Sequence, residues 1–357
     1  TRGMVAIANK DFKKAVLENN KVSYYIKDKS LNLLLKSETL KIEKKFTELE
    51  NVYDEMLKNE NTKILGLKGL MKHNLYAQDY HHAFIYGEKL FNINHSIEKL
   101  YETLVKIISK TNNWHKLIEI TEKALKFKLI DKKDFSTNKS IAYYEISKIK
   151  RYSEPKESIS LIEKALKLRQ YFPPYVCHYV ELLIRDNQLN KAKKYLQKSW
   201  SHFPHPDYKK LIEILSQKMK ISHLNFASFV IEGSKNKSES HVLMAEVFIQ
   251  DKNWIEARKY LLPYLEHKPS REVCMLMSII EKEENNDPQK ANAWISRSNF
   301  GDINNIWICS ITNISQEKWS SVSSAGYFNS LVWKKPQQLT ELQSSDIESN
   351  IIKYINN

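Results

Sequence analysis

The sequence predicts an all-α protein, a right-handed α-solenoid of stacked helix pairs that ends in a small ribbon-like β segment. The first observation is a pattern with a 34-residue spacing, in which an aromatic or apolar residue follows a turn residue and a small or apolar residue comes three positions later. The second is that 357 residues include only 7 glycines, which favours helices over a sheet-rich or dinucleotide-binding fold. The third is the loss of helical periodicity from Asn299 onward.

The recurring pattern is clearest around Tyr80 and Ala83. Steps of 34 residues lead back from Tyr80 to Phe46 and Phe12 and forward to Trp114. This is the period of the tetratricopeptide repeat, a helix–turn–helix unit that buries its apolar stripes by stacking on the next unit. We expect the first residue of each signature pair to open the second helix of its repeat, and the other residue to pack against a neighbouring helix. The signature pairs are Phe12 and Ala15, Phe46 and Leu49, Tyr80 and Ala83, Trp114 and Leu117, Pro155 and Ser158, Leu189 and Ala192, Trp254 and Ala257, and Pro288 and Ala291.

The chain is predicted to divide into five segments. Pro155 lies 41 residues after Trp114, so seven residues are inserted between the fourth and fifth repeats, and we expect a linker there. The interval between Leu189 and Trp254 leaves room for one degenerate repeat. The predicted segments are residues 1–127 with four helix pairs (2–26, 29–58, 61–92 and 95–127), the linker 128–137, residues 138–298 with five pairs (138–169, 173–202, one opening at 205, 238–266 and 269–298), a ribbon over 299–335, and a polar tail over 336–357.

Two local features support these helix assignments. Asp79, Asn253 and Asp287 directly precede signature residues, and their side chains can accept hydrogen bonds from the free N–H groups of a starting helix. Gly66 and Gly69 interrupt an apolar helical run in the third pair. A glycine inside a helix costs about 1 kcal/mol relative to alanine, so we expect these two to permit close contact with a neighbouring helix.

The net charge is +14, with 56 lysines and arginines. A basic balance can indicate nucleic acid or an anionic membrane surface as a partner. Here the lysines are spread through every repeat and mixed with glutamates, which is typical of solvated helix faces. A helical-repeat RNA binder would need a regular polar pair in each repeat, and none is present. We therefore expect no nucleic-acid partner.

Four stretches of the chain carry a resemblance to a known family. They are residues 1–7 with 11–15, residues 61–70, residues 203–207 and residues 253–258. Residues 61–70, for example, are similar to the stretch Glu-Thr-x-x-Leu-Gly-Leu-x-Gly-Leu. These stretches occur in order over nearly the whole chain and resemble the HemY family of bacterial tetratricopeptide proteins, in the form found in alphaproteobacteria.

The resemblance implies a protein associated with the bacterial inner membrane, peripheral or anchored by N-terminal transmembrane helices upstream of residue 1. No run of 18 or more apolar residues occurs within the chain itself. The resemblance also implies a nominal link to haem and porphyrin metabolism.

The C-terminal ribbon departs from the family. Members of this type commonly carry two Cys-x-x-Cys pairs there, whereas this chain keeps only Cys309 and has Thr312 in the partner position. A tetrahedral zinc site needs four nitrogen or sulfur ligands, so we expect no metal. We expect the retained aromatic residues to pack the ribbon against the last repeat; they are Trp307, Trp319, Phe328 and Trp333.

No residue pattern indicates catalysis, and neither an enzyme nor a bound cofactor is expected. The leading hypothesis is a protein–protein interaction scaffold that binds partner proteins along the concave face of the solenoid. A few of the many aromatic side chains should line that face, since aromatics dominate binding hot spots. The alternative is a haem or porphyrin carrier or sensor that binds between repeats three and four, with His81 and His82 as candidate ligands because imidazole commonly ligates haem iron.

Overall fold

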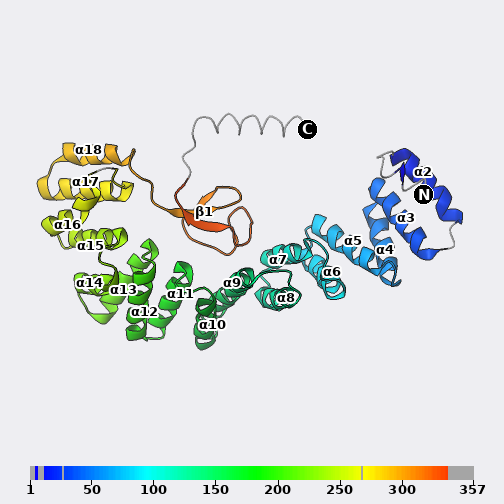
Figure 1. The fold of residues 1–357 in the computed structure, drawn as a ribbon, viewed down its shortest axis with the longest axis horizontal. Coiled ribbons are helices and arrows are strands. Elements are labelled where there is room, and N and C mark those ends of the chain that lie inside the picture. Colours follow the sequence, from blue (N-terminus) through cyan, green and yellow to red (C-terminus); the bar gives the residue numbers. More distant parts are fainter. Residues whose placement is uncertain (1–4, 7–11, 26–27, 267, 337–357) are drawn as a thin grey trace. The chain divides into compact units, whose positions relative to one another are not determined.

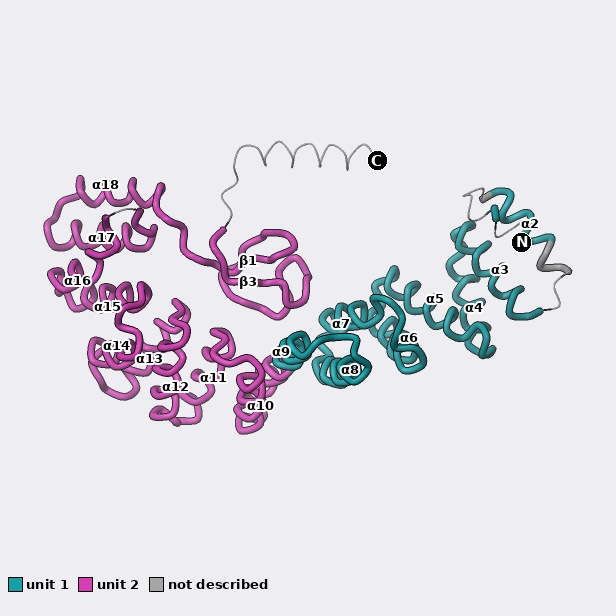
Figure 2. Tube along the Cα trace, in the orientation of Figure 1, with its two compact units in different colours: residues 1–142 teal, residues 143–357 magenta. Residues whose placement is uncertain are grey.

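The computed structural model describes residues 5–6, 12–25, 28–266 and 268–336 (Figure 1). The described part is mostly helical and has one small three-stranded sheet near its C-terminal end, which confirms the predicted fold class. The chain forms two compact units, residues 1–142 and residues 143–357 (Figure 2). Within each unit, helices that are consecutive in the sequence pack on one another, as expected for a solenoid.

The first unit contains the N-terminal helix pairs. Its helices are α2 (Phe12–Tyr25), α3 (Lys29–Ile42), α4 (Phe46–Leu57), α5 (Lys63–Tyr76), α6 (Tyr80–Ile93), α7 (Leu100–Thr111), α8 (Trp114–Lys126) and the beginning of α9 (Lys132–Lys150).

The second unit contains the end of α9, the later helix pairs and the sheet. Its further helices are α10 (Pro155–Leu168), α11 (Pro173–Arg185), α12 (Leu189–His202), α13 (Lys209–Met219), α14 (His223–Ile231), α15 (Ser238–Gln250), α16 (Trp254–Leu261), α17 (Arg271–Asn285) and α18 (Pro288–Ser298). Three short 3₁₀ turns accompany them: η1 (Pro206–Tyr208), η2 (Glu232–Ser234) and η3 (Leu262–Tyr264).

The second helix of each predicted pair begins at its signature residue. This holds for α2 at Phe12, α4 at Phe46, α6 at Tyr80, α8 at Trp114, α10 at Pro155, α12 at Leu189, α16 at Trp254 and α18 at Pro288. At three of these starts the side chain before the helix accepts a hydrogen bond from the backbone N–H three residues later: Asp79 accepts from His82, Asn253 from Glu256 and Asp287 from Lys290.

The first helix of several pairs ends in the same way. A residue with positive φ follows the helix, and the N–H groups at the turn bond back to carbonyls of the last helical turn. After α5, for example, Gln78 donates to Leu75 (3.1 Å) and Asp79 donates to Asn74 (2.8 Å), which is a Schellman motif. The residue in this left-handed position lies two places before the signature residue and is never glycine in the described turns; the positions are Lys44, Gln78, Asn112, Asn187, Lys252 and Asn286.

The second residue of each signature pair is buried, so the small side chains allow neighbouring helices to approach closely. The buried residues are Ala15, Leu49, Ala83, Leu117, Ser158, Ala192, Ala257 and Ala291. The first residues of the pairs differ more in their exposure to solvent. Trp114 is buried, Tyr80, Leu189 and Trp254 are partly exposed, and the side chain of Phe12 lies outside the described part. Phe46 is 55% exposed and so does not belong to the core, because it borders an open groove described below.

Residues 128–137 are not a linker throughout. Helix α9 begins at Lys132, so only a short turn separates it from α8. The backbone N–H of Asp134 donates to the side chain of Asp131 at 2.7 Å, which stabilises this helix start. The inserted residues therefore lengthen the first helix of the fifth pair.

The sheet consists of β1 (Ile306–Cys309), β2 (Ser315–Gln316) and β3 (Leu331–Lys334), in the antiparallel order β2–β1–β3. We expected the tryptophans of the ribbon to pack on the last repeat, but Trp307 and Trp319 pack elsewhere. The ring of Trp319 lies 5.1 Å from Phe172 and 5.5 Å from Tyr144, and the ring of Trp307 lies 5.9 Å from Phe172. Aromatic side chains of α9 and of the start of α11 thus provide the apolar surface that holds the ribbon. Contact with α17 comes instead from the connecting stretch, where the N–H of Arg271 donates to the carbonyl of Asp302.

Candidate functional site

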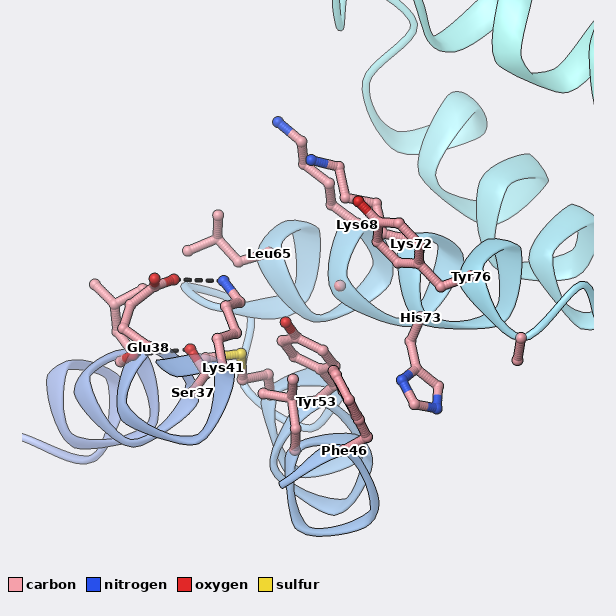
Figure 3. A pocket seen from close by; sticks show the side chains of 15 residues that line it. Ser37, Glu38, Lys41, Phe46, Tyr53, Leu65, Lys68, Lys72, His73 and Tyr76 are labelled. Atoms are coloured by element: carbon pink, nitrogen blue, oxygen red, sulfur yellow. Dashed lines mark hydrogen bonds and ion pairs between the residues drawn. The ribbon is translucent and has the colours of Figure 1, made fainter. Parts of the chain in front are cut away.

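A groove of about 700 Å³ opens in the first unit, between α3, α4 and α5 (Figure 3). Its floor belongs to a hydrophobic core that the three helices share, and Leu49, Tyr53 and Met56 of α4 contribute to both. These residues are almost fully buried, so the floor is fixed by packing. The groove is therefore a formed feature of the first unit.

Three large apolar or aromatic side chains border the groove without being buried by it. Phe46 is 55% exposed, Leu65 is 44% exposed and Tyr76 is 89% exposed. A buried floor edged by exposed aromatic side chains is typical of a surface that contacts a partner, because tyrosine and phenylalanine supply large contact areas at low conformational cost.

Two glycines of α5 allow that helix to lie close to α4. A Cβ at residue 66 would lie 2.9 Å from the carbonyl oxygen of Tyr53 and from Cβ of Met56. A Cβ at residue 69 would lie 2.4 Å from ring atoms of Tyr53. The predicted role of Gly66 and Gly69 in close helix contact is confirmed, and the ring of Tyr53 lies in the groove because residue 69 has no side chain.

The rim of the groove is basic. Lys41 on α3 is paired with Glu38 and lies 5.9 Å from the centre of the Tyr53 ring. Lys68 and Lys72 on α5 are exposed and form no ion pair or hydrogen bond with the described residues. Both project from the same side of α5 as Tyr76 (Figure 3). Lys68 and Lys72 thus provide positive charge at the groove that no described acidic side chain neutralises.

Burial alone would lower the pKa of the Lys41 ammonium. The hydrogen bond and the charge of Glu38 outweigh this effect, and the pKa of Lys41 is raised above its ordinary value. Lys41 therefore carries its charge at the groove. Burial raises the pKa of Tyr53, which keeps its hydroxyl neutral as a hydrogen-bond partner.

The groove has no described arrangement suited to nucleophilic catalysis. Its one hydroxyl other than the tyrosines, Ser37, donates to the carbonyl of Leu34 at 2.8 Å, which is a bond within its own helix. The Ser37 hydroxyl is therefore engaged within α3. Nε2 of His73 lies 3.8 Å from a carboxylate oxygen of Glu50, and its ring centre lies 6.4 Å from that of Phe46.

His81 and His82 lie in the first turn of α6 and are exposed. Nδ1 of His82 lies 2.7 Å from Oδ2 of Asp79, whose pKa is lowered by hydrogen bonds from the backbone and the side chain of His82. The two imidazoles face each other edge to face, with ring centres 5.5 Å apart. They lie together, but none of the pockets described in this structure includes them.

The turn after β1 surrounds the thiol of Cys309 with hydrogen-bond donors. This thiol is buried, with Sγ 3.3 Å from Oγ of Ser330. Burial opposes its ionisation, but hydrogen bonds from Ser330, Thr312 and two backbone N–H groups stabilise the thiolate and lower its pKa to about 6. Phe328 and Trp333, expected to pack the ribbon, are both partly exposed.

Across the described ranges, no three His, Cys, Asp or Glu side chains are placed to hold a metal ion. In the same ranges no helix has the length and apolar character needed to cross a membrane. The fold defines a helical-repeat protein of tetratricopeptide type, with a formed apolar groove and a basic rim.

Comparison with solved structures finds several similar chains. The chain is similar to the TPR2AB domain of yeast Sti1, solved in complex with pHSP90, with 10% identity over 84% of this chain and 96% of that chain and a TM-score of 0.32. It is also similar to a tetratricopeptide repeat protein from Parabacteroides merdae, with 11% identity over 70% and 93% of the two chains and a TM-score of 0.30. YrrB, described as a tetratricopeptide protein with an unusual peptide-binding site, is 18% identical over 49% and 88%, with a TM-score of 0.28.

No family model and no curated protein matches the sequence.

Sequence reasoning did not identify the groove residues. Lys68 and Lys72 are typical of a solvated helix face, and Phe46 has the position of a packing residue. A signal was nevertheless present, because Leu65, Lys68, Lys72 and Tyr76 fall on one side of a helix by their spacing. An aromatic residue in line with two lysines marks a face that differs from ordinary solvated surface.

Proposed function

We propose that this protein is a non-catalytic interaction scaffold, and that the groove between α3, α4 and α5 holds a segment of a partner protein. The observation that carries the proposal is the combination of exposed Phe46 and Tyr76 with the unpaired charges of Lys68 and Lys72. Apolar anchors give affinity and charge gives selectivity, so the partner segment should combine acidic and apolar side chains.

The length of the groove defines the kind of segment. Its lining on α5 extends from Leu65 to Tyr76, which corresponds to about 17 Å at 1.5 Å per helical residue. An amphipathic helix of about three turns fits this length, with its apolar side on Tyr53 and Phe46 and acidic side chains toward the lysines.

Photo-crosslinking tests this proposal directly. A photoreactive phenylalanine analogue at residue 76 should crosslink a partner in cells, whereas the same analogue at Tyr152, which is 71% exposed in the second unit, should not crosslink that partner. The double substitution K68E/K72E should reduce the crosslink at residue 76 by at least tenfold, because it reverses the charge of the rim.

The matched control is K106E/K110E on α7. It makes the same change of charge in the same unit, on exposed lysines that do not line the groove. Loss of the crosslink in both double variants, K68E/K72E and K106E/K110E, would mean that overall charge, and not the groove, attracts the partner.

We further propose, from the sequence resemblance to the HemY family, that the scaffold acts at the bacterial inner membrane and serves haem or porphyrin metabolism. Affinity capture from solubilised membranes tests this, with any N-terminal extension of the natural protein restored and K68E/K72E as the reference. Enrichment of porphyrin-pathway enzymes would support the metabolic link. Enrichment of unrelated envelope proteins would remove it while leaving the scaffold intact.

The alternative proposal, a haem or porphyrin carrier or sensor, rests on the neighbouring His81 and His82. Residues that follow each other on a helix point about 100° apart, so only one of the two imidazoles can ligate a given haem iron. Titration with haemin would show a Soret shift that H81A/H82A abolishes. An unchanged titration curve in the double variant excludes this site.

A further inference from the structure

A second pocket, of about 460 Å³, lies in the second unit beside the ribbon. Its walls come from the ends of α10 and α12, the start of α11 and strands β1 and β3. They are rich in aromatic side chains, among them Tyr171, Phe172, Trp307 and Trp333. None of these residues takes part in the groove of the first unit.

Strand β3 forms one side of this pocket with three consecutive residues, Leu331, Val332 and Trp333. Successive side chains of a strand point to opposite faces, so a pocket that touches all three lies along the edge of the strand. Strand β3 is the outer strand of the sheet, and Val332 is 39% exposed. The edge of β3 therefore faces the pocket.

The register of the sheet shows which backbone groups this edge offers. The N–H of Ser310 donates to the carbonyl of Ser330 at 2.8 Å, so these opposite residues form a hydrogen-bonded pair. Such pairs alternate along an antiparallel ladder, which places the N–H and C=O groups of Leu331 and Trp333 on the side away from β1. In the part of the chain that the structure describes, these groups bond to no other backbone segment. Unpaired edge groups are a template for an added strand.

The pocket also contains an uncompensated positive charge. The guanidinium of Arg169 stacks on Phe172, with Cζ 3.4 Å from the ring centre, and Nη1 is buried without a hydrogen-bond partner among the described residues. Among the described side chains that line this pocket, Arg169 is the only one with a permanent charge, and no carboxylate accompanies it. Burial lowers the pKa of Arg169, and this effect outweighs the opposing influence of its side-chain hydrogen bond with Tyr175.

Tyr171 and His202 also line the pocket. Tyr171 has a φ of 52°, a left-handed conformation that is costly for a bulky side chain. Its ring stacks on the imidazole of His202, with centres 4.0 Å apart. The stacked rings of Tyr171 and His202 form part of the aromatic wall of the pocket.

We propose that the edge of β3 and this pocket form a docking site for an extended acidic segment of a partner protein, which pairs with β3 as an added strand and places an aspartate or glutamate side chain on Arg169. Main-chain bonds to Leu331 and Trp333 supply affinity that is independent of sequence. The carboxylate supplies selectivity, because a bidentate pair with arginine is stronger and more directional than a neutral hydrogen bond. The aromatic walls receive a neighbouring apolar side chain of the segment.

The test is selection from a phage library of random decapeptides fused through their C-terminal ends, so that only side-chain carboxylates are available. Full-length protein is the target, and the selected peptides are synthesised with both ends blocked. We expect Asp or Glu at one fixed position within an alternating apolar pattern. Arg169→Gln should weaken the consensus peptide at least tenfold, whereas Gln170→Ala, a neutral change in the same pocket, should alter affinity less than twofold.

Two further measurements keep the outcome independent of the folding of the Arg169 variant. Replacing the acid of the peptide by its amide should weaken binding to the parent protein as much as R169Q does, and should cause no further loss in R169Q. Methylation of a peptide N–H that pairs with β3 should also abolish binding. The K68E/K72E variant should bind the peptide normally, because the proposed site lies outside the groove of the first unit.

Several results would overturn the proposal. One is a selection that yields no peptide dependent on Arg169. Another is additive loss from R169Q and from the amide peptide, which would mean that the two groups do not meet. A third is Arg169-dependent binding found only with a library of free C-termini, which would assign the site to a terminal carboxylate instead of a side chain.

Discussion

Replacing Gly69 by alanine measures how closely α5 packs on α4. The added Cβ would lie 2.4 Å from the Tyr53 ring, whereas ordinary contacts begin near 3.4 Å, so the ring must move by about 1 Å. Tyr53 is 5% exposed and belongs to the core, and overpacking of a core costs about 1–3 kcal/mol. The better helix propensity of alanine returns about 1 kcal/mol. We therefore expect G69A to lower the stability of the first unit by up to about 2 kcal/mol.

G69A should have the opposite effect on the stability of the first unit once the Tyr53 ring has been removed. In a Tyr53→Ala background the space beside residue 69 is open, and only the gain in helix propensity remains. There G69A should stabilise the first unit by about 1 kcal/mol. The difference between the two backgrounds, a coupling of about 1–3 kcal/mol, is the energy assigned to the contact.

Hydrogen–deuterium exchange of the full-length chain is the appropriate assay, because it reports on each unit separately. Protection of amides in residues 28–76 gives the effect in the first unit, and peptides from the second unit serve as an internal reference. Gly233→Ala is a control in the second unit for the same substitution without so close a contact. The nearest atom to its new Cβ is Cβ of Ser201 at 3.1 Å, compared with 2.4 Å for the Tyr53 ring at residue 69. If G69A changes protection equally in both Tyr53 backgrounds, the contact is not the tight one described here.

Two further predictions concern the second unit. Burial lowers the pKa of His178 to about 3 and that of His205 to about 4, so the unfolded chain binds protons between these values and about 6.5 that the folded chain does not. Stability should therefore fall as the pH drops below about 6.5, by about 1.4 kcal/mol per pH unit for each histidine, and urea denaturation of H178Q/H205Q should show a flatter slope. Arg258 joins α16 to α17 through hydrogen bonds to Glu281 (2.7 Å) and Glu284 (2.8 and 3.0 Å). Because Glu281 is 8% exposed, R258A should lower the unfolding free energy by about 1–3 kcal/mol and R258K by less, as measured in urea; equal losses would argue against the bidentate contact.

The helix starts could be predicted from the sequence because every repeat packs on its neighbour in the same way. Each unit must bury the same stripe against the next, so a turn, an opening residue and a small residue recur in one register. For the degenerate repeat predicted between Leu189 and Trp254, the sequence pattern did not locate the start of the second helix. Helix α14 begins at His223, 34 residues after Leu189, and its capping residue Ser222 accepts the N–H of Asn225. A polar histidine at the opening position concealed the register of this repeat, although Phe226, three residues later, is buried as the pattern requires.

The groove and the ribbon contacts could not be predicted in the same way. Whether Phe46 is buried depends on how α3 and α5 lie on either side of it, which one-dimensional periodicity does not contain. Likewise, Trp319 packs on Phe172, a residue far away in the sequence, because the chain turns back after α18. Contacts between distant segments follow from the three-dimensional path, whereas the repeat pattern describes only neighbours.

The left-handed residues that follow the first helices of the pairs affect how stable the individual repeats are against unfolding. At the position where glycine would be free of strain, the described turns carry lysine, glutamine or asparagine, and a non-glycine residue in this conformation costs roughly 1–2 kcal/mol. Glycine at Lys44, Gln78 or Lys252 would relieve that strain without touching the groove lining. These turns are thus strained points between successive helices, and they are the places where individual repeats are expected to open first under heat or mechanical load.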